Sequence, residues 1–309
     1  MDTETVVRNF MSDLDRNDID AVAGWFSERA TWWVDTGLDR AAGIHGHDSG
    51  KSRHWPLHGT MKVSEKLPKM HGMEKYWPEG LRQRVSRIFS DGHWALAEVE
   101  GYGVNYKGRL YQNRYAFVVE VRDQKIETIH EYLDTLHALD IFQAVQGQRT
   151  TMPKPVAPDL PVMAKNSEEE VALQLFRRVY AADIEAIEGL FAPTATWWTD
   201  TGTNRDAGKQ DREAEPGHSW SLHGTLPIAR KLKSMRGMKL AFPEGLLVIP
   251  IRCFSSPPLV ALETYGHADH TSGRPYQNRY VWVMEIKNDK IQALREYNDT
   301  LHVVDIFGA

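Results

Sequence analysis

Cysteine is almost absent from this chain of 309 residues, in which Cys253 stands alone. A single cysteine excludes an intrachain disulfide framework and any zinc site built from several cysteines. Basic residues are not in excess either, since 37 Lys and Arg stand against 42 Asp and Glu. Without a basic block, no partner that is a nucleic acid or a membrane surface is expected. Mean hydropathy is −0.49, and no apolar run is long enough to predict a membrane span.

Targeting and cofactor motifs are also missing. The opening residues, MDTETVVRNF, lack the basic start and apolar centre of a signal peptide, so we expect a cytoplasmic protein. The sequence contains no Walker loop, GxGxxG, GxSxG or HExxH motif. We therefore expect neither a nucleotide cofactor nor serine-hydrolase chemistry.

The chain contains two similar copies of one sequence. The segment ATWWVDTG at 30–37 returns as ATWWTDTG at 195–202. The segment EYLDTLHALDIF at 131–142 returns as EYNDTLHVVDIF at 296–307. The same offset in numbering relates both pairs of segments, so the two copies align without a gap. A period this long indicates a duplicated domain and not a solenoid.

The duplication predicts two domains, residues 1–142 and residues 167–309. Between them, residues 143–166 hold four prolines and little periodic apolar content, which predicts a semi-extended linker. The aromatic content is high, with 10 Trp, 11 Tyr and 10 Phe. It falls in matching sets in the two copies, which suits a pocket for a flat aromatic ligand.

Each copy predicts helices first and long strands afterwards. Apolar spacing predicts helices over 3–15 and 18–28, a strand over 30–35 and a third helix over 59–71. Four further strands are predicted, separated by turn residues, over 81–90, 94–106, 109–122 and 125–136. The fold class is therefore α+β, with a curved antiparallel sheet wrapped around helices in each copy.

This order, together with the motif GRxYQNRYxxVxE…KI…EYxDT, resembles the nuclear transport factor 2-like superfamily and, within it, the SnoaL-like polyketide-cyclase group. The resemblance covers both copies and leaves out only the linker. It implies two tandem cone-shaped half-barrels, each with a pocket between sheet and helices. It also implies chemistry by carboxylates, His and Tyr on apolar substrates, with no metal and no organic cofactor. The superfamily includes isomerases, dehydratases, cyclases, lyases and non-catalytic binders.

Reactive side chains that both copies keep are the candidates for chemistry. They include the pairs Asp35/Asp200, His58/His223, Lys66/Lys231, Glu98/Glu263, Tyr111/Tyr276, Asn113/Asn278, Glu131/Glu296, Asp134/Asp299 and His137/His302. A histidine cluster at His45, His47 and His54 is not kept, because the second copy has Gln210, Arg212 and Ser219 there. A repeated metal site would have kept it, so no metal site is predicted.

From these pairs the sequence predicts catalytic groups and pocket walls. Glu98 lies in the middle of a predicted strand, where a partly desolvated carboxylate would serve as a base near neutral pH. The predicted catalytic residues are Glu98, His58, Asp35 and Tyr115, with Glu263, His223, Asp200 and Tyr280 in the second copy. The predicted substrate-binding residues are Trp33, Trp55, Asn113 and Met73, with Trp198, Trp220, Asn278 and Met238 in the second copy. The alternative for each residue is a structural role, for Glu98 an outward-facing salt bridge.

The favoured function is a cofactor-independent acid–base lyase or dehydratase for a hydrophobic hydroxylated aromatic compound. The resemblance extends this to formaldehyde-releasing lyases for lignin-derived diaryl dimers. Two alternatives stay open: an isomerase or cyclase that moves a proton next to a carbonyl, and a non-catalytic binding or assembly module. The resemblance also implies that the two domains pair within the chain, with further homo-oligomerisation left open.

Overall fold

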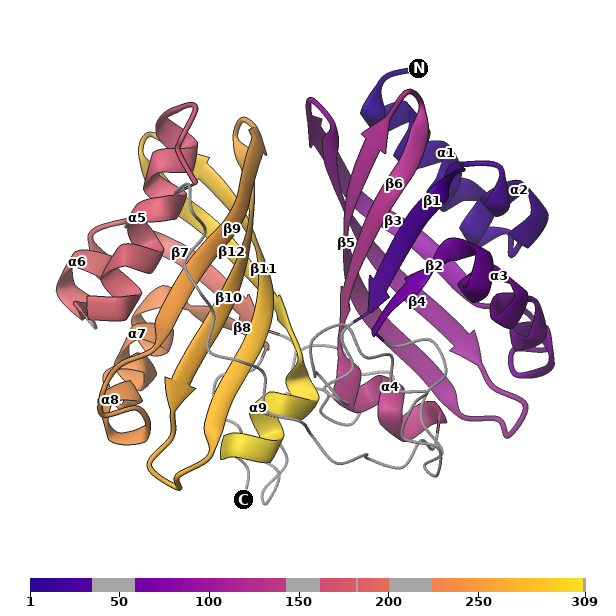
Figure 1. Ribbon diagram of the computed structural model, residues 1–309. Helices are drawn as coiled ribbons and strands as arrows, with labels where there is room; N and C mark the ends of the chain where they lie inside the picture. Colours follow the sequence, from indigo (N-terminus) through magenta and orange to yellow (C-terminus); the bar gives the residue numbers. More distant parts are fainter. Residues whose placement is uncertain (35–58, 143–161, 182, 200–223, 308–309) are drawn as a thin grey trace. The chain divides into compact units, whose positions relative to one another are not determined.

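The computed structural model describes residues 1–34, 59–142, 162–181, 183–199 and 224–307 (Figure 1). The chain divides into two compact units, of which the first holds the described residues up to 142 and the second those from 162 onward. The domain boundaries 1–142 and 167–309 and the linker 143–166 stay predictions. None of the described helices is long and apolar enough to cross a membrane.

The first unit is a six-stranded mixed sheet with its first three α-helices on one face (Figure 1). Its elements are α1 (Thr3–Asp15), α2 (Ile19–Ala23), β1 (Phe26–Val34), β2 (Gly59–Lys62), α3 (Val63–His71), the 3-10 helix η1 (Gly72–Lys75), β3 (Arg82–Asp91), β4 (Trp94–Val104), β5 (Leu110–Arg122), β6 (Lys125–Leu133) and α4 (Thr135–Phe142). The strand order is β2-β1-β6-β5-β4-β3. The sheet is open, not a closed barrel, as the half-barrel prediction requires.

The second unit repeats this architecture element by element. Its elements are α5 (Ser167–Ala181), α6 (Ile184–Glu188), β7 (Phe191–Thr199), β8 (Gly224–Pro227), α7 (Ile228–Met235), α8 (Met238–Ala241), β9 (Leu247–Ser256), β10 (Leu259–Asp269), β11 (Pro275–Lys287), β12 (Lys290–Asn298) and α9 (Thr300–Phe307). The strand order is β8-β7-β12-β11-β10-β9, the same as in the first unit. The predicted α+β class and the duplication are thereby confirmed.

Helix α1 shows why the sequence folds as it does. The Asp2 carboxylate accepts a hydrogen bond from the Thr5 backbone N–H at 2.8 Å, which caps the helix. Val6, Phe10 and Leu14 follow at helical spacing and are buried against the sheet. Burial of each such side chain stabilises the unit by roughly 1.5–3 kcal/mol. Phe10 meets Trp32 of β1 edge to face, with ring centroids 5.9 Å apart.

The boundaries differ from the prediction at several places. The helix predicted over 18–28 ends at Ala23, and the strand predicted over 30–35 begins at Phe26. The first four residues of the helix predicted over 59–71 form edge strand β2 instead. The last strand ends at Leu133, because the Asp134 carboxylate accepts from the His137 backbone N–H and begins α4.

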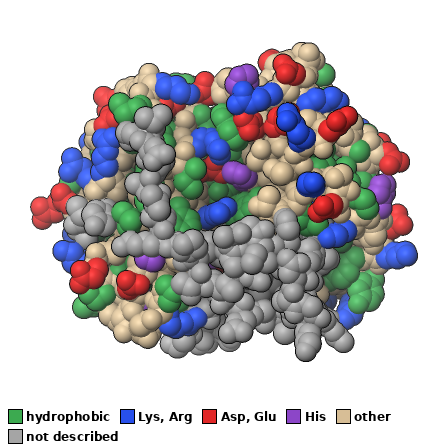
Figure 2. Space-filling model, in the orientation of Figure 1, with side chains coloured by type: hydrophobic (Ala, Val, Ile, Leu, Met, Phe, Trp, Pro, Cys, Tyr) green, Lys and Arg blue, Asp and Glu red, His purple; other side chains and the backbone are tan. Residues whose placement is uncertain are grey.

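The sheets are also not purely antiparallel. β1 pairs with β6 in parallel, and β7 pairs with β12 in parallel. The chain order permits this, since strands β2 to β5 lie between β1 and β6 in the sequence and provide the long crossover that parallel pairing requires. On the face in view in Figure 2, the described acidic and basic side chains are interspersed. This distribution agrees with the small net charge of −5.

Candidate functional site

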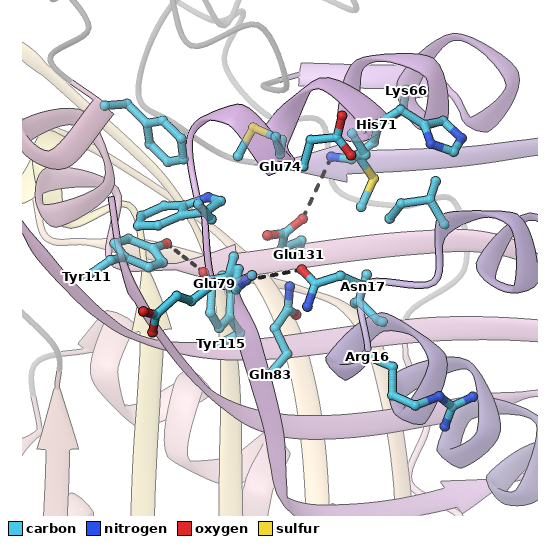
Figure 3. Close-up of a pocket in the computed structure, with 18 of the residues that line it drawn as sticks. Arg16, Asn17, Lys66, His71, Glu74, Glu79, Gln83, Tyr111, Tyr115 and Glu131 are labelled. Atoms are coloured by element: carbon cyan, nitrogen blue, oxygen red, sulfur yellow. Dashed lines mark hydrogen bonds and ion pairs between the residues drawn. The ribbon is translucent and has the colours of Figure 1, made fainter. Parts of the chain in front are cut away.

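A cavity of about 410 Å³ lies in the first unit, between the helices and the sheet (Figure 3). Its wall combines apolar side chains with a few polar ones. Trp32, Tyr111, Tyr115, Phe117 and Glu131 come from the sheet, and Lys66, Met70 and Met73 come from α3 and η1. The remaining charged and polar lining residues are Arg16, Asn17, His71, Glu74, Glu79 and Gln83. This combination of an apolar wall and a few converging polar groups is typical of a small-molecule site.

A buried ion pair lies on the wall of this cavity. Lys66 Nζ is 3.8 Å from Glu131 Oε2, and the two side chains are only 2% and 10% exposed. The Trp32 indole N–H donates to the same Glu131 oxygen at 2.7 Å. Lys66 Nζ also lies 4.4 Å from the centroid of the Trp32 ring, a cation–π contact. Trp32 therefore contacts both members of the pair.

Burial alters the protonation of both charged groups. Desolvation lowers the pKa of the Lys66 ammonium to about 8, although the Glu131 charge acts in the opposite direction. Desolvation likewise raises the pKa of the Glu131 carboxyl, against the effect of Lys66 and the Trp32 hydrogen bond. Burial therefore brings both pKa values closer to neutral pH. A group whose pKa lies near the working pH can both take up and release a proton readily.

A chain of hydroxyl groups forms a second polar feature. Asn113 Nδ2 donates to the Tyr111 hydroxyl at 2.9 Å, and the Tyr111 and Tyr115 hydroxyls are 2.5 Å apart. Burial raises the pKa of the Tyr111 phenol, so this phenol stays protonated. Because Tyr111 accepts from Asn113, it can donate to Tyr115, and Tyr115 can donate into the cavity.

A glycine makes room for this tyrosine. Gly101 of β4 lies directly under the Tyr115 ring, and a Cβ at Gly101 would be 2.5 Å from Tyr115 Cε2. Gly266 has the same relation to Tyr280, at 2.8 Å. Any larger residue at these positions would displace the ring from the cavity wall.

The second unit has the matching cavity, of about 280 Å³. Lys231 Nζ lies 3.4 Å from Glu296 Oε2, and the Trp197 indole N–H donates to the same oxygen at 2.8 Å. Burial lowers the pKa of Lys231, as it does for Lys66. The Tyr276 and Tyr280 hydroxyls are again hydrogen-bonded to each other. The whole constellation has thus been kept in both copies.

Some of the residues predicted from sequence do line these cavities. Tyr115 and Met73 line the first, and Tyr280 and Met238 line the second. Six other predicted residues lie outside the part of the chain that the structure describes, namely Asp35, Trp55, His58, Asp200, Trp220 and His223. Their predicted roles remain predictions.

The placement predicted for Glu98 and Glu263 is wrong. Glu98 pairs in register with Ala116, whereas the cavity residues Tyr115 and Phe117 pair with Val99 and Ala97. Because side chains alternate along a strand, Glu98 lies on the sheet face opposite the cavity. There it pairs with Arg87 at 3.6 Å. Glu263 is ion-paired with Arg252 in the same way.

Trp33 and Trp198 are also on the opposite face. Trp33 follows the cavity residue Trp32 and packs against His130 and Tyr132, with centroids 5.8 and 5.2 Å away. Trp198 packs against Tyr297. In a WW pair on one strand, only one indole can face the cavity. The prediction chose the wrong member of the pair.

Asn113 and Asn278 support the site but do not line it. Asn113 Nδ2 donates to the Asp134 carbonyl oxygen at 3.1 Å, and its Oδ1 accepts from the Asp134 N–H at 3.0 Å. Asn278 bonds to Asp299 in the same pattern. Both amides are buried and tie β5 or β11 to the start of the last helix of the unit. They can affect a ligand only indirectly, by donating hydrogen bonds to the Tyr111 and Tyr276 hydroxyls.

Sequence reasoning did not single out the Lys66–Glu131 pair, although both residues are kept in the second copy. A usable signal was present on α3. Val63, Lys66, Leu67 and Met70 share one helix face, so Lys66 lies on a side that must be buried. A lysine on a buried face requires a partner of opposite charge. The partner could not be identified from sequence, because Glu131 lies on β6, at the far end of the same copy.

Comparisons with known proteins agree with this fold. Residues 7–129 match the family described as SnoaL-like domain. The chain contains a SnoaL-like domain. The second unit repeats the strand order and the cavity pair of this SnoaL-like domain at the offset that relates the two copies of the sequence, so the two units form a tandem duplication. Among curated protein sequences, none matches this chain.

Solved structures with similar folds each align with about half of this chain. An NTF2-like protein of unknown function from Burkholderia pseudomallei is 14% identical, covering 47% of this chain and 99% of its own, with a TM-score of 0.38. TerC, co-crystallised with polyporic acid, is 15% identical over 47% of this chain and 100% of its own, with a TM-score of 0.38. IdmH, a candidate polyketide cyclase from Streptomyces antibioticus, is 16% identical over 47% of this chain and 100% of its own, with a TM-score of 0.37.

Within the described ranges, no three His, Cys, Asp or Glu side chains are grouped so that they could hold a metal ion. The histidines of the first-copy cluster, His45, His47 and His54, lie outside those ranges.

Proposed function

We propose that this chain is a general acid–base enzyme of the isomerase or cyclase type, acting on a hydrophobic, hydroxylated aromatic compound that carries a carbonyl. The observation that carries the proposal is the buried Lys66–Glu131 pair on the wall of an aromatic cavity. The match to the SnoaL-like family supports an enzyme of this general type. Proton transfer, with carbon–carbon bond formation in the cyclase case, needs no outside oxidant or reductant, so the proposed reaction requires no redox cofactor.

Each group has one task in the proposed reaction. Glu131 takes a proton from the carbon next to the carbonyl, and its raised pKa suits a base near neutral pH. The Lys66 ammonium and the Tyr115 hydroxyl donate hydrogen bonds to the carbonyl oxygen, where negative charge develops. The protonated Glu131 then returns the proton to another carbon of the enolate. In a cyclase, the enolate carbon would instead add to a second carbonyl carbon of the substrate, and the protonated Glu131 would give its proton to the alkoxide that forms.

The same pair supports a second candidate, the lyase or dehydratase reaction. Lys66 would protonate a leaving hydroxyl while Glu131 removes a proton elsewhere in the substrate. Loss of the benzylic hydroxyl as water from a para-phenol of a diaryl-propanediol would give a quinone methide. Removal of the terminal hydroxyl proton by Glu131 would then break the adjacent C–C bond, releasing formaldehyde, while the electron pair of that bond restores the phenol and leaves a stilbene. The observation in favour is that acid and base lie 3.8 Å apart in one cavity.

Two probes separate these candidates. The first is 2-tetralone in deuterium oxide, with exchange of its α-protons followed by NMR. The second is 1,2-bis(4-hydroxyphenyl)propane-1,3-diol, with released formaldehyde measured by colour reaction. We expect enzyme-dependent exchange of 2-tetralone and no formaldehyde. Formaldehyde release would replace the isomerase proposal by the lyase one, and binding of both probes without any reaction would indicate a binding module.

The rate of 2-tetralone exchange should fall in two pH ranges, one alkaline and one acid. It should fall as the pH rises through about 8, because the Lys66 ammonium loses its proton there. It should also fall in acid, where Glu131 is protonated, at a pH above the ordinary pKa of a glutamate because burial raises that pKa. Lys66→Arg should remove the alkaline limb, since arginine stays protonated. Lys69→Arg, an exposed change on the same helix, should leave both limbs in place.

A further inference from the structure

The two cavities differ in how the carboxylate is held, and this difference bears on which of them turns over substrate. In the second unit Glu296 accepts from Trp197 at 2.8 Å and from Thr199 Oγ1 at 2.9 Å, both at Oε2. Asn298 Nδ2 donates to Oε1 at 3.0 Å. Lys231 Nζ in turn donates to Thr199 Oγ1 at 3.0 Å. Both oxygens of Glu296 are therefore engaged by neutral donors of the protein.

The first unit lacks two of these donors. In the first copy, Val34 and Leu133 occupy the positions that correspond to Thr199 and Asn298. Within the described part of the chain, Glu131 accepts from a single neutral donor, Trp32. A base has to accept a proton from its substrate, and hydrogen bonds to the charged form oppose this. Glu131 accepts its one neutral bond at Oε2, whereas both oxygens of Glu296 already accept bonds that stabilise the charged form.

The first cavity also has polar lining groups that the second cavity lacks. Gln83 and Trp77 line the first cavity, and Gln83 Oε1 and Trp77 Nε1 are buried without a hydrogen-bond partner among the described residues. The corresponding residues of the second cavity are Val248 and Phe242. A polar ligand group can satisfy an amide or an indole N–H, but it gains nothing from valine or phenylalanine. The second cavity is also smaller, about 280 Å³ against 410 Å³.

We propose that the two cavities have divided their roles: the first unit carries out the acid–base reaction, and the second is a binding site for an uncharged, apolar aromatic molecule that it does not turn over. The division rests on the proposed function for the identity of the reaction. Thr199 and Asn298 act as positioning residues that keep both oxygens of Glu296 hydrogen-bonded within the protein.

Exchanging the residues that differ tests the catalytic half of the proposal. In the full chain, Glu131→Gln should lower exchange of 2-tetralone at least about 100-fold, because the second cavity contributes little. Adding Thr199→Val and Asn298→Leu to that variant should raise the rate by at least about tenfold, since loss of the Asn298 bond frees Oε1 of Glu296 and loss of the Thr199 bond removes one donor from Oε2. The introduced residues are those that the first unit itself uses at these positions, and thermal melting checks the fold. Half of the original rate remaining in Glu131→Gln, or no gain in the triple variant, would overturn the division.

Binding of naphthalene tests the other half without requiring turnover. Calorimetric titration of the full chain should show one naphthalene site that Val248→Gln weakens about tenfold, because the new amide is buried without a partner. Ile251→Gln, an exposed change on the same strand, is the matched control and should leave binding unchanged. Unaltered affinity in Val248→Gln would overturn the apolar site, whether or not 2-tetralone reacts. If naphthalene binds as expected while 2-tetralone never exchanges, the proposed function fails and the binding site stands.

Discussion

Replacing Glu131 and Glu296 together by glutamine is expected to lower exchange of 2-tetralone by about 10²–10⁴-fold, the usual contribution of a general base. Glutamine keeps the size of the side chain, and its carbonyl oxygen still accepts from the Trp32 or Trp197 indole. It cannot take up a proton at working pH. The fall should appear in kcat, with little change in KM, because the substrate still fits the cavity. Initial rates over a range of 2-tetralone concentrations measure both.

The matched control is the double variant Glu98→Gln and Glu263→Gln. These two carboxylates are also buried and also kept in both copies, but they lie on the opposite face of each sheet. Glutamine keeps a carbonyl oxygen that can accept from Arg87 or Arg252, so the guanidinium that remains keeps an acceptor. We expect most of the exchange rate to survive. Loss of turnover in this control and not in the Glu131/Glu296 variant would return the base to Glu98, as the sequence alone suggested.

The fold was largely predictable because its signals are local or repeated. Helical spacing identifies α1, turn residues separate the long strands, and the constant offset between repeated segments identifies two copies. The edges of elements were not predictable in the same way. Strand β1 begins at Phe26 because it pairs in parallel with β6, the last strand of the same unit. The residue types around Phe26 do not indicate that this segment pairs with a strand so distant in the sequence.

The site was predictable in kind but not in detail. Retention in both copies selected a set of reactive residues that includes Lys66, Glu131 and Tyr111. Retention cannot say which face of a strand a residue occupies. Glu98 and Trp33 were placed in the cavity without a register to decide their face, and the structure puts both on the opposite face. A one-residue shift moves a side chain to the other face of the sheet.

Lys66→Met should strongly destabilise the first unit, because it leaves the Glu131 charge in a site that is only 10% exposed. Breaking a buried ion pair from one side costs about 3–5 kcal/mol. The double change Lys66→Met and Glu131→Gln should cost far less, about 1 kcal/mol, since no charge is left uncompensated and the Trp32 N–H keeps an acceptor. Urea unfolding of the wild type, both single variants and the double variant gives the coupling directly.

The pH dependence of the Lys66→Met variant checks the cause of its instability. Without the ammonium, burial still raises the pKa of Glu131, and of the opposing influences only the Trp32 hydrogen bond is left. A carboxyl whose pKa is higher in the folded state than in the unfolded state binds more protons when folded, so folding becomes less favourable as the pH rises through that range. Stability of Lys66→Met relative to the double variant should therefore recover as the pH is lowered from 7 towards 5. A gap between the two variants that does not change with pH would mean that lost packing of the lysine chain, and not the buried charge, is responsible.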